Sequence, residues 1–420
     1  MEEFKTYTLE ELTIGKGSYG IAAPAIPFNP AKHTYLRITD INDDGTLNKQ
    51  SLMSVDDENA SNYTLKENDI VFARTGNSTG RSYFYDSSDG ELVYAGFLIK
   101  FSIDKKKVNP RILKYYTHSK TYFDWVRSFD TGGTRGNINA RTFGTMPITL
   151  PSRETQDKIV NILKFLDDKI ELNRRINRNL EQQAQALFKA WFVDFEPFKD
   201  GKFVESVLGR IPKELTISKI GDIPHKIESG RRPKGGATSE GIPSIGAENI
   251  KGLGFYDYSK TKYIPKDFAS VTNRGKILGY ELLIYKDGGK PGYFIPNYTI
   301  FGEGFPFEYM FINEHVFRLD LMSREYNIFA YFYMQTSYIM NQLNSIGGKA
   351  AIPGINTKDV ESLPIFTDDN KKVKEFGRIA LPMITTILKN SKENAHLTKL
   401  RDTLLPRLMS GELKIDDLNR

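Results

Sequence analysis

Residues 159–191 read IVNILKFLDDKIELNRRINRNLEQQAQALFKAW and carry the strongest structural pattern in the chain. Mostly apolar side chains recur there at steps that alternate between four and three residues, which is the a/d seam of a coiled coil. The seam positions are Ile159, Leu163, Leu166, Ile170, Asn173, Asn177, Leu180, Ala184, Leu187 and Trp191. The pattern predicts one long helix, of about 55–60 Å for residues 154–191 at 1.5 Å per residue.

A second stretch near the C-terminus repeats this pattern. Its seam positions are Phe376, Ala380, Met383, Ile387, Asn390, Asn394, Leu397, Arg401, Leu404 and Leu408. Each seam has two central asparagines, Asn173 and Asn177 in the first and Asn390 and Asn394 in the second. Since a polar seam residue costs stability and fixes register, the matched pairs predict two helices packed antiparallel with aligned centres. The alternative is that each helix packs only on its own globular region. Pro382 predicts that the second helix begins near that residue or kinks there.

The chain also contains a long internal repeat. Pro147-Ile148 recurs as Pro364-Ile365 at an offset of 217 residues, and the same offset aligns the seam asparagines. A repeat of this length indicates a duplicated domain, because solenoid units span roughly 20–50 residues. We therefore predict an α+β protein whose duplicated halves are related by a pseudo-two-fold axis. The predicted domains are a globular domain at 1–150, a helix at 151–198, a second globular domain at 199–366 and a second helix at 367–420.

Composition excludes several classes of protein. The 420 residues include 58 Lys+Arg and 52 Asp+Glu, a formal net charge of +6, which permits a nucleic-acid partner without requiring one. The absence of cysteine excludes disulfides, cysteine-bound zinc, iron–sulfur clusters and a thiol nucleophile. No apolar run reaches the ~18 residues of a membrane span. Met1 is followed by Glu2 and Glu3, unlike the basic start of a signal peptide. We expect a cytoplasmic protein.

Motifs that resemble catalytic or nucleotide-binding sites lack the required context. Gly15–Gly20 spells G-x-G-x-x-G, but three prolines follow by residue 30, so the helix that a dinucleotide site needs cannot begin there. Asp402, Glu412 and Lys414 imitate a nuclease spacing but lie at the end of the second predicted helix rather than on paired strands. The five histidines are isolated from one another. We predict no catalytic residue and no metal, with a metal-dependent nuclease as a minor alternative.

Basic loops that contain glycine occur in equivalent parts of both halves. Glycine permits close backbone approach, and Arg and Lys suit phosphate oxygens. Arg can also read guanine, and Asn can read adenine. One such loop is ordinarily a solvated surface loop, but five in equivalent parts of a duplicated chain make contact with DNA as good an interpretation as solvated loops. The predicted DNA-binding residues are Arg74, Arg81, Thr134, Arg135, Asn137, Asn139, Arg141, Arg231, Arg232, Lys234, Lys286, Lys290, Lys349, Asn356 and Lys358.

The quoted segments together resemble the specificity subunits of type I restriction-modification systems. Residues 166–177 (LDDKIELNRRIN) and 184–195 (AQALFKAWFVDF) are similar to the central region of that family. Residues 401–413 (RDTLLPRLMSGEL) are similar to its C-terminal repeat. Residues 229–236 (SGRRPKGG) and 242–250 (IPSIGAENI) resemble one class of its target recognition domains.

The resemblance implies that each globular domain is a target recognition domain that reads half of a bipartite, gapped site in double-stranded DNA. It implies that the helices set the gap and dock two methyltransferase subunits, which translocase/endonuclease subunits would join. It also implies that this chain is not catalytic and that S-adenosylmethionine, ATP and Mg are held by partner subunits. The alternative from another class is a coiled-coil interaction protein with two ligand-binding heads and no role on DNA.

Overall fold

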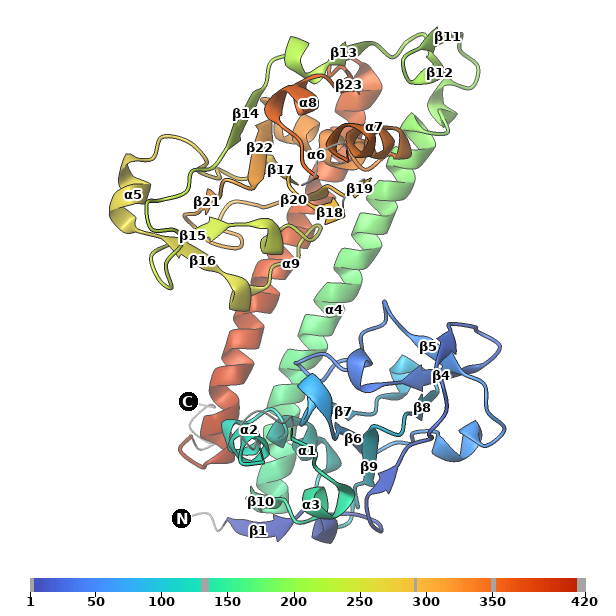
Figure 1. Cartoon of the computed structure of the whole chain (residues 1–420), viewed down its shortest axis with the longest axis vertical. Coiled ribbons are helices and arrows are strands. Elements are labelled where there is room, and N and C mark those ends of the chain that lie inside the picture. Colours follow the sequence, from blue (N-terminus) through green and yellow to red (C-terminus); the bar gives the residue numbers. More distant parts are fainter. Residues whose placement is uncertain (1–3, 130–135, 291–292, 349–352, 414–420) are drawn as a thin grey trace. The chain divides into compact units, whose positions relative to one another are not determined.

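The computed structural model describes residues 4–129, 136–290, 293–348 and 353–413 of the chain (Figure 1). These residues form two compact units of mixed helix and sheet. Unit 1 comprises residues 1–168 and 397–420, and unit 2 comprises residues 169–396. Two long helices, α4 (Arg153–Phe192) and α9 (Lys371–Met409), contribute a segment to each unit.

Two four-stranded sheets form the described centre of unit 1. The strands are β1 (Lys5–Thr8), β2 (Ser18–Tyr19), β3 (Ile26–Pro27), β4 (His33–Leu36), β5 (Met53–Val55), β6 (Asp69–Ala73), β7 (Ser82–Phe84), β8 (Leu92–Tyr94), β9 (Leu98–Ser102) and β10 (Pro147–Leu150). The short helices are α1 (Pro110–Tyr116), α2 (Lys120–Arg127) and α3 (Ala140–Gly144). One sheet has the antiparallel order β2-β9-β6-β7, and the other has the order β3-β5-β4-β8 with β4 and β8 parallel. Strand β1 pairs with β10.

Unit 2 repeats this plan. Its strands are β11 (Phe203–Ser206), β12 (Gly209–Pro212), β13 (Ile217–Lys219), β14 (Lys226–Ser229), β15 (Ile242–Ile245), β16 (Lys262–Ile264), β17 (Leu282–Tyr285), β18 (Gly289–Lys290), β19 (Tyr293–Phe294), β20 (Asn297–Ile300), β21 (Phe311–Ile312), β22 (Val316–Asp320) and β23 (Pro364–Phe366). Its short helices are α5 (Lys266–Val271), α6 (Arg324–Tyr333), α7 (Ser337–Gly347) and α8 (Thr357–Glu361). The antiparallel sheet β14-β22-β17-β20 corresponds to β2-β9-β6-β7, and the parallel pair β15–β21 corresponds to β4–β8. The predicted duplication and α+β class are confirmed.

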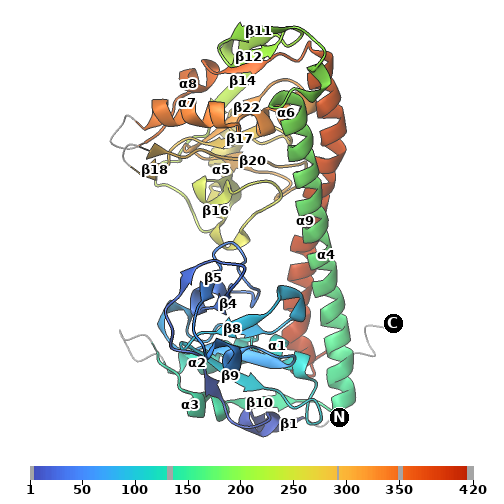
Figure 2. The same ribbon diagram turned by 90° about the vertical axis from the view of Figure 1, so that its right-hand side faces the viewer.

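Within each unit, the segments of the two long helices lie side by side in opposite directions (Figures 1 and 2). Within unit 2, the Asn173 amide donates to Asn394 Oδ1 at 2.9 Å, and the Asn390 amide donates to Asn177 Oδ1 at 2.9 Å. Residue numbers therefore rise along α4 as they fall along its partner α9. The predicted antiparallel pairing, with the asparagine pairs aligned, is confirmed.

Each long helix also contributes to the hydrophobic core of both units, unlike the alternative in which each packs on one globular region. In unit 1, Leu163 of α4 and Leu408 of α9 lie in one buried cluster. In unit 2, Phe188 of α4 and Phe376 of α9 lie in another, with ring centroids 5.4 Å apart.

The prediction that the second helix begins near Pro382 is wrong. Helix α9 begins at Lys371 and is continuous through Pro382. Proline inside a helix costs about 3 kcal/mol, partly through a lost backbone hydrogen bond. Pro382 is exposed, whereas Ala380 and Ile384 on either side of it are fully buried. Packing of the buried face therefore outweighs the local penalty.

Candidate nucleic-acid interface

Arg74 lies where three segments of unit 1 meet. It directly follows β6, whose five residues are all buried. Its backbone N–H donates to the Phe97 carbonyl at 3.1 Å, and its own carbonyl accepts from the Ile138 N–H at 3.0 Å. These bonds join the end of β6 to the segment before β9 and to the loop before α3.

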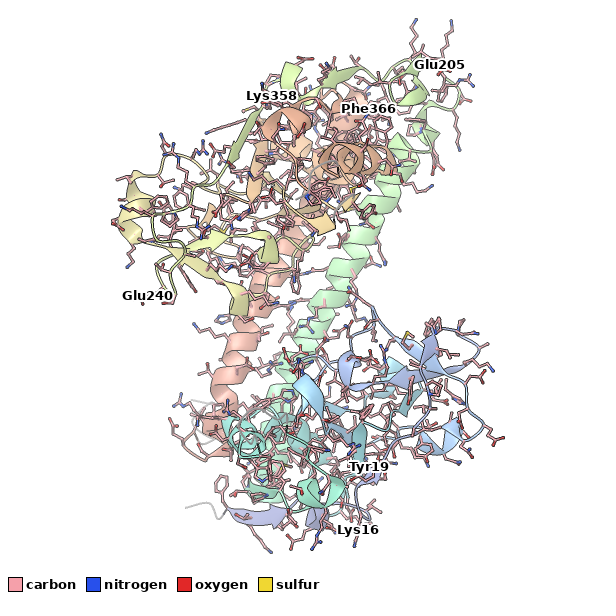
Figure 3. The ribbon with its side chains drawn as sticks, in the orientation of Figure 1. Lys16, Tyr19, Glu205, Glu240, Lys358 and Phe366 are labelled. Atoms are coloured by element: carbon pink, nitrogen blue, oxygen red, sulfur yellow. The ribbon has the colours of Figure 1, made fainter. Side chains whose placement is uncertain are left out.

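The Arg74 guanidinium lies against two exposed aromatic rings. Its central carbon is 5.3 Å from the Tyr19 ring centroid and 5.8 Å from the Phe97 ring centroid. Tyr19 is 44% exposed and Phe97 is 55% exposed. Tyr19 is held in turn, because its hydroxyl accepts from the Ala140 N–H at the start of α3 (Figure 3). Arg74 Nη1 lies 3.5 Å from Asn137 Oδ1, so two predicted DNA-binding residues come together here.

Two other predicted residues of unit 1 have structural roles. Arg81 forms an ion pair with Asp43 at 2.5 Å and donates to the Ile41 carbonyl at 3.2 Å, which holds the turn after β4. Asn139 is the N-cap of α3, where its side-chain oxygen accepts from the Thr142 N–H at 2.9 Å. The spacing Asn-x-x-Thr could have revealed this cap in the sequence.

Lys286 occupies the position in unit 2 that Arg74 occupies in unit 1. It directly follows β17, its N–H donates to the His315 carbonyl at 3.1 Å, and its carbonyl accepts from the Ile355 N–H at 2.9 Å. Its ammonium lies 5.0 Å from the Phe317 ring centroid. His315 therefore takes the place of Phe97, and lysine takes the place of arginine.

Charged side chains extend this arrangement in unit 2. His315 Nδ1 lies 2.7 Å from Asp287 Oδ2, and His315 Nε2 lies 3.6 Å from Glu314 Oε1. The same Glu314 oxygen lies 3.8 Å from Arg232 Nε. These pairs connect the basic loop after β14 with the segment after β17.

The loop before α8 ends in the same kind of cap as the loop before α3. Asn356 Oδ1 accepts from the Asp359 N–H at 3.2 Å, and Asp359 Oδ2 accepts from the Asn356 N–H at 2.8 Å, which is a reciprocal capping box. Lys358 is exposed on α8 (Figure 3). Both predicted asparagines thus fix the ends of the loops that carry them.

The remaining predicted residues are placed as follows. Arg141, Arg231 and Lys234 are exposed. Lys290 lies in β18, and Thr134, Arg135 and Lys349 lie outside the described residues. Sequence reasoning missed Tyr19, Phe97 and His315. One offset could not have found them, because Arg74 corresponds to Lys286 at 212 residues and Phe97 corresponds to His315 at 218 residues.

The geometry at the end of α9 does not favour the nuclease alternative. Asp402 Oδ1 lies 2.8 Å from Arg401 Nη2, and Glu412 Oε1 lies 3.1 Å from Arg407 Nε. Lys414 is not among the described residues. Where side chains are described, no group of three or more His, Cys, Asp or Glu residues is arranged to hold a metal ion. Every helix in the described ranges is too short or too polar to cross a lipid bilayer.

Comparison with known proteins supports recognition of DNA. Residues 1–182 match the family model of the type I restriction modification DNA specificity domain. The type I restriction enzyme MjaIX specificity subunit of Methanocaldococcus jannaschii is 27% identical over 326 residues, covering 75% of this chain and 72% of that protein. The HindI specificity subunit of Haemophilus influenzae is 25% identical over 424 residues, covering 83% of this chain and 87% of that protein.

A solved structure shares the fold. The S subunit of a type I restriction-modification system from M. genitalium is 17% identical, with a TM-score of 0.57 over 97% of this chain and 96% of that chain. At this identity the likeness supports the fold alone. The family match and the two relatives are similarities of sequence. Residues 1–182 thus match the DNA specificity domain of type I restriction-modification systems, and most of the chain is similar to specificity subunits of those systems.

Proposed function

We propose that each unit of this DNA-recognition subunit reads one half of a gapped DNA sequence. The observation that carries the proposal is the arrangement around Arg74, which recurs in unit 2 around Lys286. In both places a basic residue directly follows a buried strand, and its backbone forms hydrogen bonds to two neighbouring segments. The backbone hydrogen bonds recur in the two units, but the side chains differ. We therefore expect the two half-sites to differ in sequence.

The same proposal extends to the partner subunits. Two methyltransferase subunits would dock on the chain and bring S-adenosylmethionine for adenine methylation, and translocase/endonuclease subunits would bring ATP and Mg for cleavage. This chain would carry out recognition alone, without a cofactor of its own. The continuity of α4 over 40 residues and of α9 over 39 residues supports a role for the paired helices in setting the gap.

Methylome sequencing tests the proposal. Cells that carry this chain with its methyltransferase partner should acquire one adenine-methylation motif in two parts, separated by a fixed gap. An insertion of four residues in each of α4 and α9 should change the tolerated gap or abolish methylation. The control is the same insertion in the β11–β12 turn next to Val207, which is 67% exposed, and it should leave the motif unchanged (Glu205 marks this hairpin in Figure 3).

The outcome separates the two classes of function. Phosphate contacts make DNA affinity fall steeply with salt, by about 10³- to 10⁵-fold between 50 and 200 mM for 6–10 contacts. Complexes of this chain with its methyltransferase that bind DNA without such a slope, and methylate no two-part motif, would favour the interaction-protein alternative.

A further inference from the structure

Arg74 is held in place more completely than its sequence suggests. Both of its backbone polar groups are bonded, to Phe97 and to Ile138, so the start of the side chain is fixed. The far end lies against the Tyr19 and Phe97 rings at 5.3 and 5.8 Å. A cation held over aromatic faces is stabilised by the ring quadrupoles. The guanidinium is thus oriented before any DNA arrives.

The orientation leaves one edge of the guanidinium for a ligand. Arg74 Nε is buried, and the described structure gives it no hydrogen-bond partner. Nη1 lies beside Asn137, at the border of an exposed surface made by the two rings. The edge formed by the two terminal nitrogens is therefore the one that can meet a partner. Two parallel N–H donors match the O6 and N7 acceptors that guanine presents in the major groove.

We propose that Arg74 is a specificity-determining residue that reads a guanine in the half-site of unit 1, with Tyr19 and Phe97 as positioning residues. The inference rests on the proposed function and names the chemistry of one contact. A phosphate oxygen is the other acceptor that arginine prefers, and it carries no sequence information. The fixed orientation of the Arg74 guanidinium favours contact with the base. A planar pair of donors held in one direction selects between base pairs, whereas a phosphate contact does not need that selectivity.

Unit 2 offers an internal comparison. Lys286 has the same backbone bonds but carries a compact ammonium over Phe317 instead of a planar fork. An ammonium donates in any direction and cannot present two parallel donors in one plane. The equivalent position of unit 2 therefore reads its half-site by different chemistry, and Lys286→Ala should affect that half alone.

The test uses the full complex of this chain with its methyltransferase partner. Competition binding is measured against duplexes in which each base pair of the first half-site is replaced in turn, at several salt concentrations. Wild-type protein should discriminate at one G·C pair, and Arg74→Ala should lose roughly 10- to 100-fold of that discrimination while other positions keep theirs. Arg74→Lys should keep the charge and the salt slope but lose part of the discrimination, because an ammonium can donate to guanine O6 and N7 without forming a planar fork.

Further variants separate positioning from folding. Phe97→Leu removes one ring but keeps the backbone carbonyl that Arg74 uses, so discrimination should fall at the same base pair with an unchanged melting temperature. Arg127→Ala is the matched control, because Arg127 is 63% exposed in the same unit and pairs with Asp124 on its own helix. It should bind and discriminate like the wild type.

Two outcomes would overturn the inference. Arg74→Ala could weaken binding equally at every base pair and lower the salt slope by about 1, which is the signature of a phosphate contact. It could also bind and discriminate like the wild type, in which case the residue does not touch DNA. Neither result affects the proposed function, which fails only if the wild-type complex shows no sequence preference.

Discussion

Asp167 of α4 is the centre of a charged cluster in unit 1, and its replacement by asparagine should destabilise that unit. Its carboxylate lies 3.0 Å from Arg401 Nη1 and 2.9 Å from Lys114 Nζ, and it accepts from the Tyr115 hydroxyl at 3.1 Å. The side chains of Asp167 and Arg401 are 16% and 22% exposed. Asp167→Asn keeps the shape but leaves two neighbouring cations without their shared anion.

The expected loss in the free energy of unfolding lies between the values for a buried and for an exposed ion pair. Breaking a buried ion pair costs about 3–5 kcal/mol, and an exposed pair contributes about 0–1 kcal/mol. Because these groups are mostly but not fully buried, we expect about 2 kcal/mol. This corresponds to a fall of about 4–8 °C in the melting temperature of a unit of this size. Asp168→Asn is the control, since Asp168 is 60% exposed and pairs with Lys164 on the surface, and it should cost less than about 0.5 kcal/mol.

Hydrogen exchange localises the effect and pH checks its cause. Amides of α9 in unit 1 should exchange about 30-fold faster in Asp167→Asn. Burial by itself raises the pKa of Asp167, but Lys114 and Arg401 outweigh burial and hold the net pKa below its usual value. The stabilisation is therefore present above the unfolded value of about 4 and lost as pH falls through the lower folded pKa. Equal stability of Asp167→Asn and Asp168→Asn at pH 7 would refute this reasoning.

Four further substitutions in unit 2 test its polar contacts. Asn390→Leu should lower the free energy of unfolding in urea by about 1–2 kcal/mol, because it removes the donor to Asn177. Adding Asn177→Leu should recover part of that loss, and a double variant less stable than Asn390→Leu would contradict this reasoning. Arg318→Met should cost about 3–5 kcal/mol by removing the cation that Glu281, which is 3% exposed, shares with Glu228, and by leaving the Glu281 carboxylate only its backbone donors; a loss below 1 kcal/mol would contradict this. Glu181→Gln should stabilise the protein at pH 7, because burial raises the pKa of Glu181 and charging it there is unfavourable. That gain should vanish below pH 4 in thermal melts, and a gain that persists there would point to another cause.

The helix pair could be predicted because its information is local and periodic. A seam with steps of four and three needs no knowledge of the rest of the chain, and the central asparagines add register. The start of α9 could not be predicted, because Pro382 argues locally against a helix. What decides the matter is the burial of Ala380 and Ile384, and that depends on the whole core of unit 2.

The residues around Arg74 and Lys286 could be identified from the sequence only in part, for a similar reason. Glycine and basic residues marked the loops of Arg74 and Lys286 in the sequence. Tyr19 and Phe97 carried no such mark, since single aromatic residues are usually core residues. Their approach to Arg74 follows from the strand order β2-β9-β6-β7, in which strands distant in sequence become neighbours. The spacing of residues along the sequence does not predict that strand order.

In the proposed function, stability and specificity are carried by different groups. The bonds that fix Arg74 and Lys286 are made by backbone atoms, which every residue type except proline possesses, so they leave the choice of side chain almost free. The Arg74 side chain lies against two exposed rings, whereas the Lys286 ammonium lies against the Phe317 ring, which is 2% exposed. A duplicated unit can therefore exchange arginine for lysine, and Phe97 for His315, without a change in sheet order. This division explains how one scaffold, used twice in a chain, can present two different recognition surfaces.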